Sequence, residues 1–279
     1  MTTITEPGLY DDIAEAAYHG DPYSPSLSST MAKLILKSPA HLRHHLDEGS
    51  ERKPAFDFGS AVHTLILGKG WPITILDFPD WRSKEARLQR EAAWISESIP
   101  MLQKDYEEAA AVEAAVRAHP IAGPLFAGEG KAEVSAFGEH ESGVKMRGRF
   151  DWATPTGIIV DLKTARSADP NDFASTAANF GYDVQAAHYM AVHELATGES
   201  SKAFVHVLVE KEPPYLVSVV QLDDEFIDLG RSKLERAVRR YEHALNTDEW
   251  PGYPATLHPI TPKPYMVYDE DDQAEKEES

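Results

Sequence analysis

A β-like segment near the middle of the chain, residues 158–164, carries an acid and a lysine in an otherwise apolar run. Asp161 and Lys163 are two residues apart, so in a strand both would project from the same face. Ile159 shares that face, and the other apolar residues face the opposite way (Ile158, Val160 and Leu162). Polar residues that break an apolar strand pattern often mark functional sites. Asp161 and Lys163 are therefore candidate site residues, although an Asp-x-Lys pair on a strand is more often a solvated edge.

A second acid, Asp151, precedes this segment across a turn-forming sequence, residues 155–157. If the turn is a three-residue hairpin loop, with Gly157 in the left-handed conformation that such loops favour, Asp151 lies directly opposite Asp161 on the same sheet face. A four-residue loop would instead set Asp151 opposite Val160, on the other face. The position of the glycine favours the shorter loop and predicts two carboxylates that face each other.

Two facing carboxylates repel each other unless a cation relieves the repulsion. Oxygen ligands in a chain without cysteine favour Mg²⁺ or Mn²⁺. Metal ions would generate the nucleophile and stabilise the leaving oxygen of an in-line displacement at phosphorus, while Lys163 holds and polarises the attacking water. Arg147 and Arg149 share the face of Asp151 if the strand is regular, and would contact the phosphates. Taken alone, these two arginines are more often surface charges.

The elements that must position these residues follow from apolar periodicity and from helix and strand breakers. Helices come first, then three strands, a helical stretch, two strands and a long amphipathic helix. This order predicts an α/β fold with a mixed sheet, on which the amino-terminal helices pack. The expected strands are 131–137, 144–153, 158–164, 203–210 and 215–222, and the expected helices are 26–37, 39–45, 58–68, two within 82–118, 172–180, 183–196 and 223–245.

Length and composition narrow the class of protein. The chain has 279 residues, of which 42% are hydrophobic, so it can bury a sizeable core. It lacks the run of ~20 apolar residues that spans a bilayer, and its first residues have no signal-peptide pattern. The absence of cysteine excludes disulfides, thiolate zinc sites and a cysteine-held iron–sulfur cluster. We therefore expect a cytoplasmic protein without membrane contact.

The formal net charge of −19 opposes the basic footprint that is usual for nucleic-acid binders. Residues 269–279 hold seven acids and one lysine, and we expect this tail to be disordered. The rest of the chain still carries a charge of −13. Contact with DNA would therefore need a local basic strip, and the best candidate includes Arg82, Lys84 and Arg87.

An Asp, a hairpin and an Asp-x-Lys form the core motif of the PD-(D/E)xK nuclease superfamily, which the chain resembles at Asp151, Asp161 and Lys163. Two more motifs are similar to the RecB-like branch of that superfamily. One is a histidine on an upstream helix, His63, and the other is the Gln-x-x-x-Tyr segment Gln185–Tyr189. Within the branch, the chain looks most similar to the phage and prophage exodeoxyribonuclease VIII type.

This resemblance covers residues 18–245 and implies a restriction-endonuclease-like mixed sheet flanked by helices. It implies two bound metal ions and catalysis by Lys163 with the acids and the downstream helix. The implied metal ligands are His63, Glu133, Asp151, Asp161 and the Leu162 carbonyl, and the implied catalytic residues are Asp151, Asp161, Lys163, Gln185 and Tyr189. From spacing alone, His63 and Tyr189 would more often be core residues.

The implied activity is a Mg²⁺- or Mn²⁺-dependent exodeoxyribonuclease that acts on double-stranded DNA ends in phage-type recombination or repair. The resemblance also implies a homo-oligomeric ring around DNA and a single-strand annealing protein as partner. Two alternatives are a non-catalytic DNA-processing or partner-binding protein, which the acidic charge favours, and a DNA endonuclease. The expected organisation is one structural domain, with a helical part (1–125), a nuclease core (126–250) and an extension (251–279).

Overall fold

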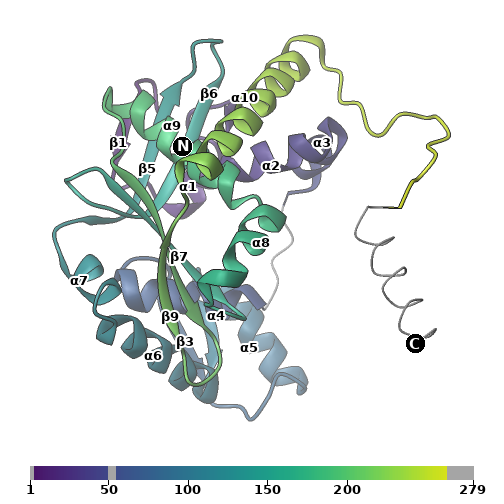
Figure 1. The fold of residues 1–279 in the computed structure, drawn as a ribbon. Coiled ribbons are helices and arrows are strands. Elements are labelled where there is room, and N and C mark those ends of the chain that lie inside the picture. The colour runs from purple at the N-terminus through teal and green to yellow at the C-terminus, as the bar shows by residue number, and fades with distance from the viewer. Residues whose placement is uncertain (1–2, 50–54, 263–279) are drawn as a thin grey trace, which may run out of the picture.

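A mixed sheet forms the centre of the computed structural model, which describes residues 3–49 and 55–262 (Figure 1). Within these residues the sheet has seven strands in the order β1-β5-β6-β7-β8-β9, and β2 pairs with β6. The pairs β2–β6 and β7–β8 are parallel and the others antiparallel, which confirms the predicted mixed sheet. The strands are β1 (Gly8–Tyr10), β2 (Ser26–Leu27), β5 (Lys131–Glu139), β6 (Lys145–Ala153), β7 (Ile158–Ala165), β8 (Ala203–Glu210) and β9 (Val217–Gln221).

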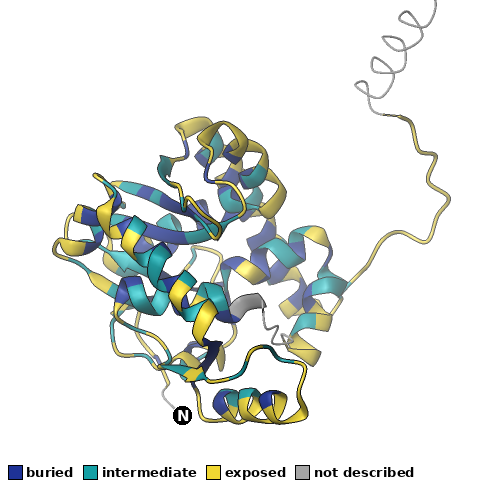
Figure 2. Ribbon diagram, turned by 90° about the horizontal axis from the view of Figure 1, so that it is seen from below, coloured by how far each residue is buried: buried dark blue, intermediate teal, exposed yellow. Residues whose placement is uncertain are grey.

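Helices cover both faces of this sheet, because its strands are apolar on both sides. Along β7, Ile159 packs in a first core with α2, α9 and α10, whereas Val160 packs in a second core with α4 and α6. Figure 2 shows the buried residues on the inner sides of the helices. The helices are α1 (Glu15–His19), α2 (Ser29–Lys37), α3 (Pro39–Glu48), α4 (Ala55–Leu67), α5 (Lys84–Ile95), α6 (Gln103–Ala118), α7 (Ala122–Ala127), α8 (Pro170–Phe180), α9 (Tyr182–Thr197) and α10 (Asp224–Thr247).

The amino-terminal part is less helical than the sequence predicts. Strands β1 and β2 join the central sheet, and a separate two-stranded parallel sheet pairs β3 (Ile73–Leu76) with β4 (Ile99–Leu102). Helix α5 connects these two strands and α6 follows β4, so the two helices expected within 82–118 are present, with β4 between them. Pro100 lies in this short strand, a position that a proline tolerates at a sheet edge.

Two further expectations concern the carboxyl-terminal half. Asp183, the first residue of the expected helix 183–196, is fully buried and pairs with Lys233 of α10 at 2.5 Å. Helix α9 begins after Gly181, which has a left-handed conformation. The acidic tail expected to be disordered lies outside the described residues. None of the helices in the described part of the chain combines the length and the apolar character that crossing a bilayer requires.

Candidate active site

The hairpin between β6 and β7 has the predicted register. The Thr154 amide donates to the Ile158 carbonyl at 3.0 Å, and Gly157 has a left-handed φ of 81°. The three-residue loop is therefore confirmed and the four-residue alternative is wrong. Trp152 pairs with Val160 and Ala153 with Ile159, which is the register that puts Asp151 and Asp161 at the next opposed positions.

At Asp151, however, the backbone pairing between β6 and β7 stops. The Leu162 amide donates to Oδ2 of Asp151 at 2.7 Å, so a side chain takes the place of a strand carbonyl. On the other side of Asp151, the ladder with β5 skips Glu133, whose φ of 54° is left-handed and unfavourable for a side chain with a Cβ. As a result, Phe150 packs in the first core and Trp152 in the second, although regular alternation would put them on one face.

This break brings three potential metal ligands together. One ligand atom from each of His63, Glu133 and Asp151 lies within 4.8 Å of the other two. Nε2 of His63 donates to the Leu162 carbonyl at 2.8 Å, because a carbonyl can only accept. The lone pair is then left on Nδ1, which lies 3.8 Å from Oδ2 of Asp151. A backbone bond that fixes the tautomer in this way is typical of metal-binding histidines.

Asp161 belongs to a second, neighbouring group rather than to this cluster. Its carboxylate, 1% exposed, lies 2.7 and 2.8 Å from Nζ of Lys163 and accepts a hydrogen bond of 2.7 Å from Gln185 on α9. Tyr189, one turn later on α9, has a side-chain hydrogen bond with Gln185 and packs against Phe150. The structure therefore divides the expected site residues into a ligand cluster and a buried ion pair.

The charges of the two groups respond differently to burial. Burial alone would raise the pKa of Asp161, but the neighbouring groups, led by the ammonium of Lys163, together hold that pKa below its usual value. Burial would lower the pKa of Lys163, and Asp161 with Asp151 raises it above its usual value instead. Burial raises the pKa of Glu133 to about 7, and the charge of Asp151 adds to this effect. Arg149 lowers the pKa of Glu133 but does not outweigh burial, whereas the ion pair holds its carboxylate in the charged form.

The chemistry of the three clustered side chains suits a divalent cation. The cluster offers two carboxylates and an imidazole nitrogen, which are ligands of Mg²⁺, Mn²⁺ and related ions. A bound cation would favour the ionised form of Glu133 and Asp151, both of which burial destabilises. The residues present therefore fit a divalent ion. The Leu162 carbonyl, expected as a further ligand, accepts the His63 hydrogen bond and keeps one lone pair.

The two arginines of β6 differ in position. Arg149 lies beside Glu133, at 3.9 Å, and also donates to the Ile13 carbonyl at 2.6 Å. Arg147 is buried and pairs with Asp21 at 2.8 Å. The prediction that Arg147 faces phosphate is corrected, because Arg147 also donates to the Ser26 carbonyl at 2.6 Å and is covered by this amino-terminal segment.

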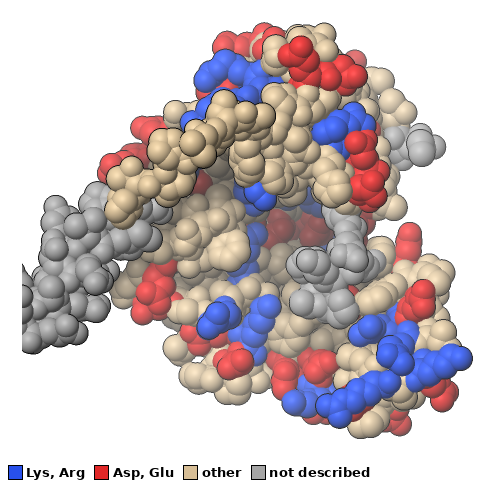
Figure 3. Space-filling view, turned by 90° about the vertical axis from the view of Figure 1, so that its right-hand side faces the viewer, with Lys and Arg blue, Asp and Glu red and all other residues tan. Residues whose placement is uncertain are grey.

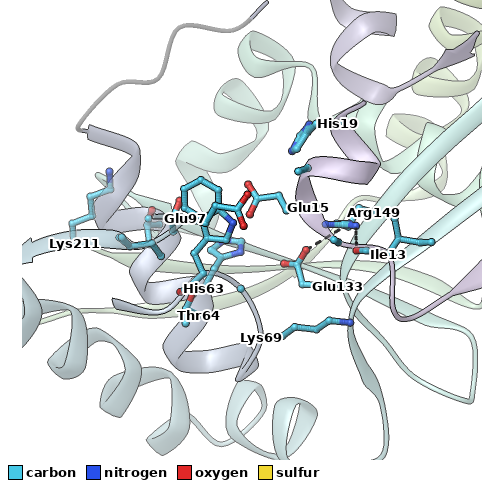
Figure 4. Close-up of a pocket in the computed structure, with 18 residues that line it drawn as sticks. Ile13, Glu15, His19, His63, Thr64, Lys69, Glu97, Glu133, Arg149 and Lys211 are labelled. Atoms are coloured by element: carbon cyan, nitrogen blue, oxygen red, sulfur yellow. Dashed lines mark hydrogen bonds and ion pairs between the residues drawn. The ribbon is translucent and has the colours of Figure 1, made fainter. Parts of the chain in front are cut away.

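A cavity of about 780 Å³ opens onto the ligand cluster. Figure 4 shows His63, from α4, and Glu133, from β5, lining this space, and Arg149 joined to Glu133 and Ile13. Figure 3 shows the hollowed face of the molecule, with both acidic and basic side chains in its depth. Several lining residues carry no sequence motif and were not predicted: Glu15, His19, Lys69, Glu97 and Lys211.

The predicted basic strip lies apart from the cavity lining. Arg82, Lys84 and Arg87 are exposed, at the start of α5 and within it, and none of them lines the cavity. Arg90 of the same helix stacks between the rings of Trp81 and Trp94, 5.0 Å from each ring centroid. The strip is accessible to a partner outside the cavity.

Comparison with known proteins agrees with this fold. The model of a PDDEXK-like domain of unknown function (DUF3799) matches residues 28–257. A solved structure titled "Putative exonuclease", from Eubacterium rectale, is 17% identical, covers 90% of this chain and 96% of its own, and has a TM-score of 0.60. A phage related exonuclease from Haemophilus somnus 129PT is 12% identical, with coverages of 81% and 98% and a TM-score of 0.37. No curated protein matches the chain.

The family match spans most of the chain and includes every residue of the ligand cluster and of the buried ion pair. The first solved structure supports the same fold over nearly the whole chain. Together with the hairpin and the Asp-x-Lys strand, these matches establish that the chain belongs to the PDDEXK-like family DUF3799.

Proposed function

We propose that the protein is a Mg²⁺- or Mn²⁺-dependent deoxyribonuclease that hydrolyses double-stranded DNA from its ends. The observation that carries the proposal is the ligand cluster of His63, Glu133 and Asp151 next to the Lys163–Asp161 ion pair. A cavity large enough for part of a nucleotide strand opens onto that cluster. The likeness to proteins titled exonucleases motivates the choice of DNA ends over internal sites.

A divalent ion bound at the cluster would supply Lewis-acid stabilisation of the phosphate and a water of lowered pKa. Asp151 and Glu133 would hold that ion together with His63, whose ring is oriented by its hydrogen bond to the Leu162 carbonyl. Arg149, beside Glu133, is placed to bind a phosphate oxygen of the strand.

Lys163 acts in this scheme as a cation and not as a base. Its pKa is raised by Asp161 and Asp151, so it stays protonated near neutral pH and donates a hydrogen bond to a phosphate oxygen or to the attacking water. Gln185 holds the carboxylate of Asp161, and that carboxylate orients Lys163. Tyr189 acts through Gln185 as a positioning residue.

The finer expectations remain part of the proposal. They are a second metal ion, a role in phage-type recombination or repair, a homo-oligomeric ring and a single-strand annealing partner. The chain contains no cysteine, so it has no cysteine-held iron–sulfur cluster.

The test is digestion of linear and covalently closed duplex DNA with Mg²⁺, Mn²⁺ or a chelator. We expect wild type to degrade linear DNA only, and only with metal. Lys163→Ala should lose this activity, whereas Lys104→Ala, which alters an exposed lysine on α6, should keep it. Cutting of closed circles would favour an endonuclease, and failure to cut any substrate with either metal would contradict the proposed function.

A further inference from the structure

A column of aromatic rings leads from the surface toward Lys163 at the corner between α8 and α9. Phe180, at the end of α8, is 63% exposed, and its ring stacks on Tyr182 with centroids 5.8 Å apart and planes 21° apart. Tyr182 stacks in turn on the buried Phe173 at 5.9 Å and 27°. The inner rings are thus fixed by the core, and the outermost ring is presented to solvent.

Two lysines flank this column. Nζ of Lys163 lies 5.4 Å from the centroid of the Tyr182 ring. Lys33 of α2 packs along Gly181, the residue between the two aromatics, so closely that a Cβ there would lie 2.9 Å from its Cδ. The ammonium of Lys33 makes no hydrogen bond or ion pair with another described residue. Burial and the charge of Lys163 lower the pKa of Lys33, so an anionic partner would stabilise its charged form.

A flat exposed ring with an unpaired cation beside it matches one ligand class, a nucleotide. Aromatic rings stack on nucleobases of any sequence, and lysines bind the phosphates between them. Bases inside a duplex are already covered by their neighbours, so the ring can stack only on an unpaired base or on the last base pair. An apolar ligand would leave Lys33 without a partner, and a free anion would leave the face of Phe180 uncovered.

We propose that Phe180, Tyr182 and Lys33 form a nucleotide subsite beside the reaction centre. Phe180 stacks on an unpaired base of the DNA strand under attack, Tyr182 supports that ring, and Lys33 binds the adjoining phosphate. Gly181 permits this arrangement, because its φ of 65° turns the chain from α8 into α9 and its missing Cβ leaves room for Lys33. The inference rests on the proposed function for the identity of the ligand as DNA.

The test measures binding to duplexes that carry 2-aminopurine in a single-stranded overhang or at a blunt end. The full chain is used with Mg²⁺, and phosphorothioate linkages slow hydrolysis. We expect quenching on binding for the overhang. Phe180→Ala should weaken overhang binding about 5- to 100-fold and abolish the quenching, and Phe180→Trp should restore both. Tyr253→Ala, which removes another exposed ring, should change neither.

Lys33→Ala should make the plot of log affinity against log salt concentration less steep, by the amount that corresponds to about one lost phosphate contact. If Phe180→Ala and Lys33→Ala bind the overhang as wild type does, while wild type digests linear DNA, the subsite is wrong and the proposed function stands. If binding depends on Phe180 but no DNA is cut with either metal, the subsite stands and the nuclease activity is wrong. If wild type neither binds nor cuts DNA, both are wrong.

Discussion

The amide of Leu162 donates to the side chain of Asp151, not to a main-chain carbonyl of β6, across 2.7 Å. This bond occurs where the two strands part, and it fixes the carboxylate next to His63 and Glu133. The position of a metal ligand is therefore set by a hydrogen bond that also ends the strand pairing. Substitutions at Asp151 can therefore separate the effect of its charge on metal binding from the effect of its hydrogen bond on stability.

Asp151→Asn should keep the folded structure and lose metal binding, because the amide oxygen can still accept from Leu162 but carries no charge. Asp151→Ala should lose metal binding and also ~1–3 kcal/mol of unfolding free energy, because it leaves a part-buried amide without a partner. Urea unfolding and calorimetric titration with Mn²⁺ measure the two effects. Equal stability of the two variants would contradict the structural role of this bond.

Lys163→Ala should destabilise the protein by ~3–5 kcal/mol, because it leaves the charge of buried Asp161 without its partner. The double variant Lys163→Ala, Asp161→Asn should recover most of that free energy. It should not recover DNA cleavage, since the cation remains absent. Recovery of cleavage in the double variant would show that Lys163 serves only to neutralise Asp161.

The metal-free protein should become less stable as pH rises from about 4.5 to about 7. The pKa of Glu133 is raised to about 7 in the folded chain from an ordinary value of 4.5, so ionisation favours the unfolded state across this window. Glu133→Gln should remove this part of the pH dependence, as measured by urea unfolding at several pH values.

Metal binding should show the opposite dependence in wild type. Because Glu133 must lose its proton to bind an ion, Mn²⁺ affinity should rise through pH 7, with proton release seen as buffer-dependent heat. Metal affinity that is constant between pH 6 and pH 8 would argue against Glu133 as a ligand.

Arg147→Ala and Arg149→Ala should have different consequences. The first removes the partner of Asp21 in a part-buried pair and should cost ~1–3 kcal/mol of stability. The second should weaken DNA binding and make DNA affinity less dependent on salt concentration, by the amount that corresponds to about one lost phosphate contact. Thermal unfolding and fluorescence anisotropy separate the two. A larger loss of DNA affinity for Arg147→Ala, at unchanged stability, would reverse the assignment.

Much of the site could be predicted from the sequence because its acids lie on one hairpin, whose strands and loop are adjacent in the chain. Gly157 fixes the loop, the loop fixes the register, and the register sets Asp151 opposite Asp161. The strands of the core and the long carboxyl-terminal helix likewise follow from patterns within one element. The combination of parallel and antiparallel pairs agrees with the predicted mixed sheet.

What the sequence could not predict depends on contacts between distant segments. The interior position of Arg147 is set by Asp21, more than a hundred residues earlier. Strand β4 exists because β3, on the other side of α5 in the chain, lies beside it. The left-handed Glu133 has no local signal either, because only the neighbouring strands hold it in that conformation.

The buried pair of Lys163 and Asp161 also has a consequence for the order in which ligands load. The two charges cancel, and Arg149 offsets one of the two acids in the ligand cluster, so the ionised centre keeps a residual charge of about −1. A divalent ion reverses that sign. The chain has a net charge of −19 and repels DNA, so the positive charge of a bound ion is needed at the site before DNA can bind there. The ion should therefore bind first.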